Sequence, residues 1–178
     1  MPDVTASPNA ELRHARLDDW DAFKGVYESI AAEGTWIGGE LPIDWDARWP
    51  MWEVSINDPR WLVVLAFVGD KTVGWVSAEH QSHGRVNLGM GLIDGYRSMG
   101  IGTMLMATVV GWAKQRGSHK ITLELWTHND RARGLYEKFG FVVEGRHRRH
   151  WRREDGSLWD CLSMGLVLDE ESPGSPFG

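Results

Sequence analysis

The sequence predicts an α/β (α+β) fold, in which a single domain holds a central mixed, mostly antiparallel sheet flanked by helices. Its 178 residues suit one domain with a sizeable core. Hydrophobic residues make up 42% of the chain and charged residues 25%, which is typical of a globular protein. Between residues 11 and 168 the hydrophobic spacing switches between the helical and the strand period, without a linker or an internal repeat. We therefore expect the domain at 11–168 and disordered ends at 1–10 and 169–178, which are polar and contain proline.

The first part of the domain should hold a short strand and two helices. The strand is expected at residues 12–15. A helix should begin at Asp18 or Asp19, because the hydrophobic residues that follow are spaced for one helical face: Trp20, Phe23, Val26, Tyr27 and Ile30. Residues 33–46 are rich in Gly and Trp and predict a loop. A second helix is expected at 46–57, where Asp58-Pro59 ends it, although Pro50 is unfavourable inside it.

Three strands should come next. Residues 61–68 form an apolar run of strand length, Gly69-Asp70 predicts a turn, and residues 72–80 predict the second strand of a hairpin. Ser82-His83-Gly84 predicts another turn, so a third strand is expected at 85–93.

Helices and strands alternate in the second half. Helices are expected at 101–116 and 129–139, and strands at 120–127, 141–153 and 157–168. Gly117 and Gly140 are typical helix ends, and Asn129 or Asp130 is a typical N-cap. Asp155-Gly156 lies between two strand patterns and strongly predicts a hairpin.

Charge and cysteine content exclude several classes of protein. The net charge of −6 disfavours nucleic-acid binding, which usually needs a basic face, and is compatible with a cationic substrate. No apolar run approaches the ~20 residues of a membrane span, and the N-terminus does not resemble a secretory signal. A single cysteine, Cys161, favours a reducing compartment, so we expect a cytoplasmic protein without a membrane partner.

The segment at residues 88–103 carries the strongest chemical signal. A strand runs through Arg97 into Gly100 and Gly102, which open a helix. The first turn of a helix leaves N–H groups unpaired at the positive end of the helix dipole, and glycines let a ligand approach the backbone. This arrangement predicts a pyrophosphate site, with Arg97 beside it. It is neither a Walker loop nor a G-x-G-x-x-G fingerprint, so the phosphate ligand is of another kind.

Two motifs in order resemble the GNAT superfamily of N-acetyltransferases. Arg97-x-x-Gly100-x-Gly102 is similar to its acetyl-CoA motif, and residues 129–141 (NDRARGLYEKFGF) are similar to its second signature, N-x-x-A-x-x-L-Y-x-x-x-G-F. Glu144-Gly145-Arg146, Asp155-Gly156, Asp160 and Met164 resemble the closing hairpin of its small-amine and ribosomal-protein acetyltransferase branches. The resemblance spans residues 12–168 and includes the order of the elements, so it implies the GNAT fold.

The resemblance also implies acetyl-CoA as co-substrate and assigns residues to it. The pantetheine arm would pair with the backbone at Leu92 and Ile93, and Asn129 would contact it. The pyrophosphate would lie on the backbone amides of the phosphate loop: Arg97, Ser98, Met99, Gly100, Ile101, Gly102 and Thr103. Asp94-Gly95 stands where the family often has proline, so the turn before the loop is expected to differ.

The reaction implied is direct attack of an amine on the thioester, without a covalent enzyme intermediate. The oxyanion needs an N–H donor, which the backbone at Leu92 or Ile93 could supply. Tyr136 would assist the departing thiolate, and alternatively is only a core tyrosine. The family does not fix the position of the base, so the candidates are Glu124, Glu79 and His80. Glu124 is equally compatible with an ion-pair role.

The acceptor site and the remaining polar residues leave alternatives open. Aromatic and acidic residues should wall a pocket for a cationic amine: Glu33, Trp36, Glu40, Trp45, Glu79 and Trp151. The acceptor is expected to be a small-molecule primary amine. The alternatives are a protein N-terminus or lysine, or a CoA-binding sensor without turnover. A homodimer is possible.

Other residues are expected to have structural roles. Cys161 has no obvious histidine partner in the sequence and is expected to be structural, and the histidines show no metal-ligand spacing, so no metal is expected. Residues 147–153 carry six basic or histidine side chains. They predict a solvated hairpin surface, or alternatively a contact to the 3′-phosphate of CoA or to the acceptor.

Overall fold

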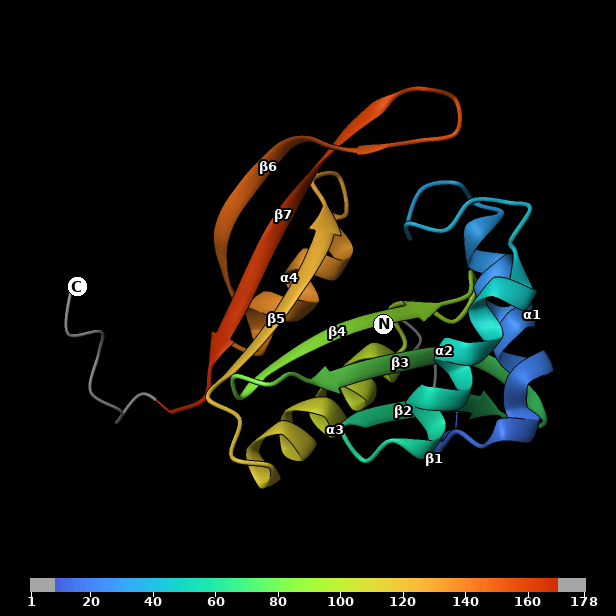
Figure 1. Ribbon diagram of the computed structural model, residues 1–178, viewed down its shortest axis with the longest axis horizontal. Coiled ribbons are helices and arrows are strands. Elements are labelled where there is room, and N and C mark those ends of the chain that lie inside the picture. Colours follow the sequence, from blue (N-terminus) through green and yellow to red (C-terminus); the bar gives the residue numbers. More distant parts are fainter. Residues whose placement is uncertain (1–8, 170–178) are drawn as a thin grey trace, which may run out of the picture.

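A seven-stranded sheet forms the centre of the protein in the computed structural model, which describes residues 9–169 (Figure 1). The strands are β1 (Ala10–His14), β2 (Trp61–Val68), β3 (Lys71–His80), β4 (Arg85–Leu92), β5 (Lys120–Trp126), β6 (Val142–Arg152) and β7 (Leu158–Val167). The helices are α1 (Trp20–Ala31), α2 (Trp45–Asn57), α3 (Ile101–Gln115) and α4 (Asp130–Lys138), with a short 3-10 turn, η1, at Leu17–Asp19.

The order of the strands is β1-β2-β3-β4-β5-β7-β6, and every neighbouring pair is antiparallel except β4 and β5. The parallel pair is joined only through Arg85–Asn87 and Lys120–Thr122. Beyond this point the two strands diverge, as the ribbon shows (Figure 1). The sheet is therefore continuous at one end and open at the other, between β4 and β5.

Helices cover both faces of the β1–β4 half. Figure 1 shows α1 and α2 in front of the sheet and α3 behind it. Residues 62–66 of β2 are buried without interruption, which a strand can be only when both of its faces are covered. The core includes fully buried side chains from β2 and α3: Leu62, Leu65, Leu105, Met106 and Val109.

Much of the tryptophan content packs between the first two helices and the sheet. Trp20 contacts Trp45, Trp49 and Trp52, and Phe23 stacks on Trp52 and meets Trp75 of β3 edge to face. Aromatic pairs at such distances add stability beyond the area they bury. These contacts fix α1 and α2 against β3, and with them the loop between the two helices.

The helix boundaries differ slightly from those expected. The 3-10 turn η1 precedes α1, so the regular helix begins at Trp20 rather than at Asp18 or Asp19. The second helix begins at Trp45, because the side chain of Asp44 accepts a hydrogen bond from Ala47 N at 2.9 Å and caps it. The helix continues through Pro50, which has no N–H to donate to the backbone carbonyl one turn earlier. The residues around Pro50 are exposed, so water can bind that carbonyl instead.

The predicted fold class is confirmed, namely a single mixed sheet, mostly antiparallel and flanked by helices. The segments expected to be disordered lie largely outside the described residues, but Ala10 already belongs to β1 and pairs with Val68. Among residues 9–169 no helix is long and apolar enough to cross a membrane.

Candidate active site

A cleft of about 790 Å³ opens where β4 and β5 diverge. It runs from the start of α3, past the exposed edge of β4, to the aromatic residues at the ends of β5 and β6. Its lining includes Tyr27, Trp36, Trp75, Leu92, Arg97, Ser98, Gly100, Gly102, Thr103, Glu124, Trp126, Asn129, Asp130, Arg131, Tyr136, Trp151 and Cys161. Its size is typical of ligand sites, and the residues of the phosphate loop lie at one end of it.

The edge of β4 offers backbone groups to this cleft. Ile93 N donates to Val73 O at 3.0 Å, so that amide points toward β3 and is already occupied. Successive amides of a strand point to opposite edges, so the N–H of Leu92 points toward the opening. Of the two amides expected to serve an extended ligand or an oxyanion, only that of Leu92 is therefore directed into the cleft.

The N-terminus of α3 is suited to bind an anion. Gly100 is the N-cap, with φ of 84°, and no side chain caps the helix. The first turn carries no acidic residue, so nothing opposes the positive end of the helix dipole. Gly100, Gly102 and Thr103 line the cleft together with Ser98, whereas Met99 and Ile101 do not line it. The anion site predicted from the glycine pattern thus has free donors where it needs them.

Arg97 does not point freely toward that site. Its guanidinium forms a two-pronged ion pair with Glu33, just past the end of α1, in which Nη1 lies 2.7 Å from Oε2. Its Nε donates to Leu92 O at 2.9 Å. The same carboxylate accepts a hydrogen bond from Trp36 Nε1 at 2.7 Å. The hydrogen bond from Arg97 holds the pKa of Glu33 below its ordinary value. Glu33, expected to meet a cationic substrate, is instead neutralised by Arg97.

Tyr136 lies on the inner face of α4 and is 6% exposed. Its ring packs against Phe141, and it lines the cleft. Burial raises the pKa of its phenol. The hydroxyl therefore stays protonated at neutral pH and remains a hydrogen-bond donor.

Asn129 caps α4. Its side chain accepts a hydrogen bond from Ala132 N at 3.2 Å, and it also lines the cleft. The capping role is therefore present, and its amide nitrogen still has hydrogens to donate to a ligand.

The rest of the cleft lining is rich in aromatic rings. Trp36 and Trp151, both expected, are joined there by Tyr27, Trp75 and Trp126. Glu124 projects from β5 into this region and is 45% exposed. The cleft thus combines aromatic faces with a carboxylate, an arrangement that suits a cationic amine.

Three of the expected acceptor or base residues lie elsewhere. Glu79 sits opposite Trp61 and Asn87 at the other end of β3 and does not line the cleft, and His80 follows it. Trp45 belongs to the aromatic cluster of α1 and α2. The positions of Glu79 and His80 do not support a role as base, because β3 runs antiparallel to β4 and carries them away from the diverging end.

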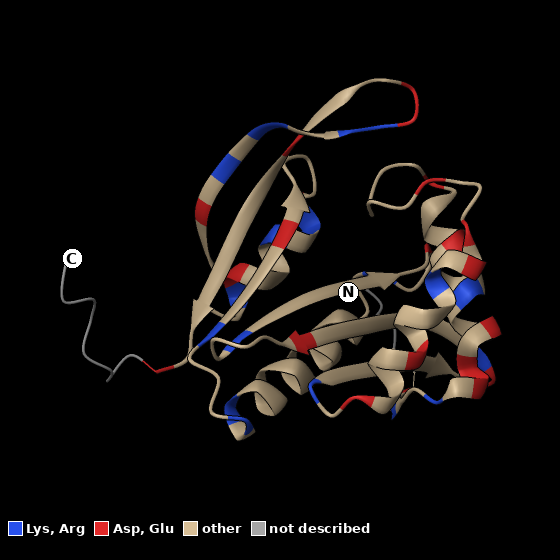
Figure 2. Ribbon diagram, viewed as in Figure 1, with Lys and Arg blue, Asp and Glu red and all other residues tan. Residues whose placement is uncertain are grey.

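Arg153 ties the two walls of this end together. It was expected on a solvated surface but is only 5% exposed, because its guanidinium lies over Trp126 and Trp159. Its Nε lies 3.3 Å from Glu40, and its Nη1 donates to Gly38 O at 3.2 Å. Arg153 belongs to the tip of the β6–β7 hairpin and Glu40 to the α1–α2 loop. Figure 2 shows that both segments carry charged residues and that the tip faces the loop. The hairpin tip is therefore tied to the α1–α2 loop through Glu40, and both segments contribute residues to the cleft lining.

Cys161 is buried beside this region. Burial raises the pKa of its thiol to about 11, so the thiolate needed for a covalent acyl intermediate is scarce at neutral pH. This agrees with the expectation that it is not a nucleophile.

Sequence reasoning missed Tyr27, Trp75 and Trp126, because each sits on a helix or strand face that reads as core. It did not single out Arg153 within the basic run 147–153, because its partner Glu40 lies 113 residues earlier in the chain. A charged residue next to the predicted Asp155-Gly156 turn was the available signal, but the many basic neighbours concealed it.

Comparisons with known proteins agree with this geometry. Residues 17–141 match the family described as the acetyltransferase (GNAT) family. The chain is 22% identical over 166 residues to the L-methionine sulfoximine/L-methionine sulfone acetyltransferase of Pseudomonas aeruginosa, covering 90% of this chain and 96% of that protein.

Solved structures share the fold. A GNAT-family acetyltransferase of Streptococcus pneumoniae superposes with a TM-score of 0.79 at 22% identity, covering 90% of this chain and 100% of that chain. A phosphinothricin acetyltransferase of Sinorhizobium meliloti, in complex with acetyl-CoA, gives 0.79 at 19% identity, covering 94% of each chain.

The ion pair between Glu33 and Arg97 generates a testable prediction. Glu33→Gln should lower the free energy of unfolding by about 2 kcal/mol near pH 7, because it removes hydrogen bonds to a half-buried charged group. The folded pKa of Glu33 is lowered, so the wild-type advantage is complete above the ordinary value of 4.5 and is lost as pH falls through the folded pKa. Urea unfolding of the wild type and the variant at about pH 7 and about pH 3 measures the stability difference and its loss in acid.

Glu137→Gln is the matched control, since Glu137 pairs with Arg133 on an exposed helix face. It should change stability by less than about 0.5 kcal/mol. A difference for Glu33→Gln that is equally large in acid would contradict the ion-pair explanation.

Proposed function

From the premise that the chain belongs to the acetyltransferase (GNAT) family, we propose that it transfers an acetyl group from acetyl-CoA to the primary amine of a small molecule. The observation that carries this proposal is the cleft between β4 and β5, which joins an anion site at α3 to an aromatic, acidic pocket. Transfer takes place by direct attack in a ternary complex, which fits the high pKa of the Cys161 thiol.

The residues of this chain fit acetyl-CoA. The pyrophosphate would lie on the amides of 97–103, where Gly100 and Gly102 leave the backbone accessible and the helix dipole favours negative charge. The pantetheine arm would run along β4 at Leu92, past Asn129. Arg97 contributes by holding the loop to α1 through Glu33 rather than by contacting the phosphates.

The reaction needs a neutral amine and a donor for the carbonyl oxygen as negative charge develops on it. Leu92 N–H is the donor, since Ile93 N–H is bonded to Val73 O. Glu124 is the proton acceptor, directly or through a water. It lies in the aromatic part of the cleft, whereas Glu33 is paired and Glu79 lies outside.

Tyr136 stabilises the departing thiolate with a hydrogen bond. Its raised pKa makes full proton transfer unfavourable, so the proton stays shared with the phenol oxygen. This refines the role of a general acid, which the sequence motif implied.

A small acceptor is favoured over a protein because the hairpin tip is bonded to the α1–α2 loop beside the cleft. Arg153 joins that tip to residues 37–40 of the α1–α2 loop, which narrows the space a peptide would need. Two similar proteins, a methionine sulfoximine acetyltransferase and a phosphinothricin acetyltransferase, are named for small acceptors. A protein N-terminus or lysine is the second candidate.

The deciding experiment combines calorimetric titration of acetyl-CoA with an acceptor panel of amino-acid analogues, polyamines, aminoglycosides and short peptides. We expect micromolar binding of acetyl-CoA and acetylation of one class of small amine, detected by mass spectrometry. Acetylation of peptides alone would overturn the small-molecule assignment. Binding without any turnover would favour a sensor, and absence of binding would refute the reading of the phosphate loop.

Gly100→Ala should weaken acetyl-CoA binding about tenfold, which corresponds to ~1.4 kcal/mol. At φ of 84° an L-residue is strained, so the loop would shift and misalign the amides of the first turn. Gly111→Ala, in the same helix with no atom within 4 Å of the added methyl group, is the control and should leave binding unchanged. Equal dissociation constants for the two variants would contradict this prediction.

Tyr136→Phe should lower kcat about 10²-fold while leaving the dissociation constant of acetyl-CoA nearly unchanged, since it removes only the hydroxyl group. Steady-state kinetics with an acceptor found in the panel measure kcat, and calorimetry measures the dissociation constant of acetyl-CoA. A variant with weakened binding and wild-type kcat would assign Tyr136 to cofactor packing instead.

A further inference from the structure

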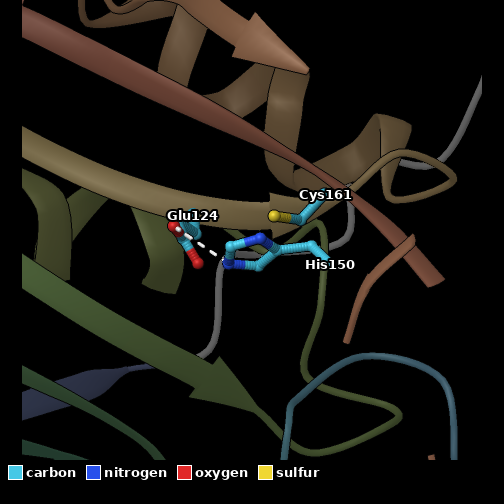
Figure 3. Close-up of side chains that lie close together, drawn as sticks. All are labelled: Glu124, His150 and Cys161. Carbon is cyan, nitrogen blue, oxygen red and sulfur yellow. Dashed lines mark ion pairs between the residues drawn. The ribbon is translucent and has the colours of Figure 1, made fainter. Parts of the chain in front are cut away.

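Three side chains of different chemistry converge at the acceptor end of the cleft, as Figure 3 shows: Glu124 from β5, His150 from β6 and Cys161 from β7. Their carboxylate oxygen, imidazole nitrogen and sulfur atoms all lie within 4.8 Å of one another, and Glu124 Oε1 is 4.0 Å from His150 Nε2. Cys161 is only 1% exposed, but it lines the cleft together with Glu124, so the group is reached from inside the site.

An irregularity in β6 directs His150 to this place. Pairing with β7 passes from His147–Cys161 to Trp151–Trp159, so three residues of β6 face one residue of β7. Within this bulge Arg149 adopts a φ of 53°, a left-handed conformation that costs a non-glycine residue free energy. Asp160 stabilises it by accepting a hydrogen bond from Arg149 N at 2.7 Å. Bulges re-aim side chains and are common beside functional sites.

This set of donors matches the preferences of one class of metal ion. Magnesium and calcium prefer oxygen ligands, whereas an imidazole, a thiolate and a carboxylate together suit zinc and its neighbours. Zinc bonds of about 2.0–2.3 Å place tetrahedral ligand atoms roughly 3.3–3.8 Å apart. Glu124 and His150 are 45% and 43% exposed, so their side chains are free to close the remaining distance of at most about 1.5 Å.

We propose that Glu124, His150 and Cys161 form a binding site for one zinc-like divalent cation, with its fourth position open to the cleft. Sequence spacing did not predict it, because the three residues are far apart in the chain and only the β5-β7-β6 order of the sheet brings them together. A cation there would bind the lone pair of an incoming amine and occupy Glu124. It would therefore inhibit acetyl transfer, a consequence that rests on the proposed function.

The binding test does not depend on the acceptor. The full chain, stripped with a chelator and kept in a phosphine reductant, is titrated with Zn²⁺ by calorimetry and with Co²⁺ by absorption spectroscopy. We expect one ion per chain and a thiolate-to-cobalt charge-transfer band. Cys161→Ser should remove that band. His150→Ala removes a ligand at an exposed position. It should weaken zinc binding by more than roughly 10–100-fold, the loss seen when only a residue hydrogen-bonded to a metal ligand is removed.

His83→Gln is the matched control, because His83 lies in the exposed turn between β3 and β4. It should bind zinc as the wild type does. Absence of stoichiometric binding, a cobalt spectrum without the thiolate band, or equal affinity of the wild type and His150→Ala would overturn the proposal.

Inhibition is tested separately, with acetylated product measured by mass spectrometry because zinc binds the free thiol of CoA. Zinc should lower the rate of acetylation by the wild type. It should not change the rate of acetylation by Cys161→Ser. If no amine in the panel is acetylated, the function proposal fails while the metal titration still decides the site. If both proteins are slowed equally, the link between this site and inhibition is wrong.

Discussion

The divergence of β4 from β5 is the constraint on which the rest of the structure depends. The two strands share only three residue pairs. Thr122 belongs to the last of them, and its hydroxyl donates a hydrogen bond to Val86 O. Past that point the amides of alternate residues on β4 lack a neighbouring strand, which in a folded protein requires another partner. Placing α3 directly after this unpaired edge puts a helix N-terminus at one end of the same opening. An extended ligand with an anionic end satisfies both needs at once.

The loop that begins α3 is fixed by electrostatics from inside the protein. Arg97 sits over Trp36, bonds to Leu92 O and pairs with Glu33, so a single guanidinium joins α1, β4 and the loop. Because its charge is balanced by Glu33, the anion site proposed at the start of α3 would rely on backbone amides rather than on this guanidinium. Amides that are already fixed need not rearrange when a ligand binds, so the loop loses little conformational entropy at that step.

The sequence predicted the elements well because each boundary has a local cause. The turn residues at Gly69, Gly84 and Gly156 all have positive φ, and Gly117 and Gly140 end their helices as expected. The phosphate loop and Tyr136, which line the cleft, stand out in the sequence because they belong to motifs with fixed local spacing. The roles of Glu33 and Arg153 were not predictable, since each depends on a partner more than 60 residues away. The same holds for His150, whose direction depends on a bulge that no residue pattern marks.

The buried position of Arg153 limits how this protein's substrate range could change. The Arg153 guanidinium, from the tip of the β6–β7 hairpin, bonds to residues 37–40 of the α1–α2 loop. Neither segment can therefore be replaced without affecting the other. Replacing the α1–α2 loop alone would strand a charge between Trp126 and Trp159, and losing one partner of a buried pair typically costs about 3–5 kcal/mol. New acceptor specificities should therefore arise through paired exchanges of loop and hairpin, and a directed-evolution library would need to vary both segments together.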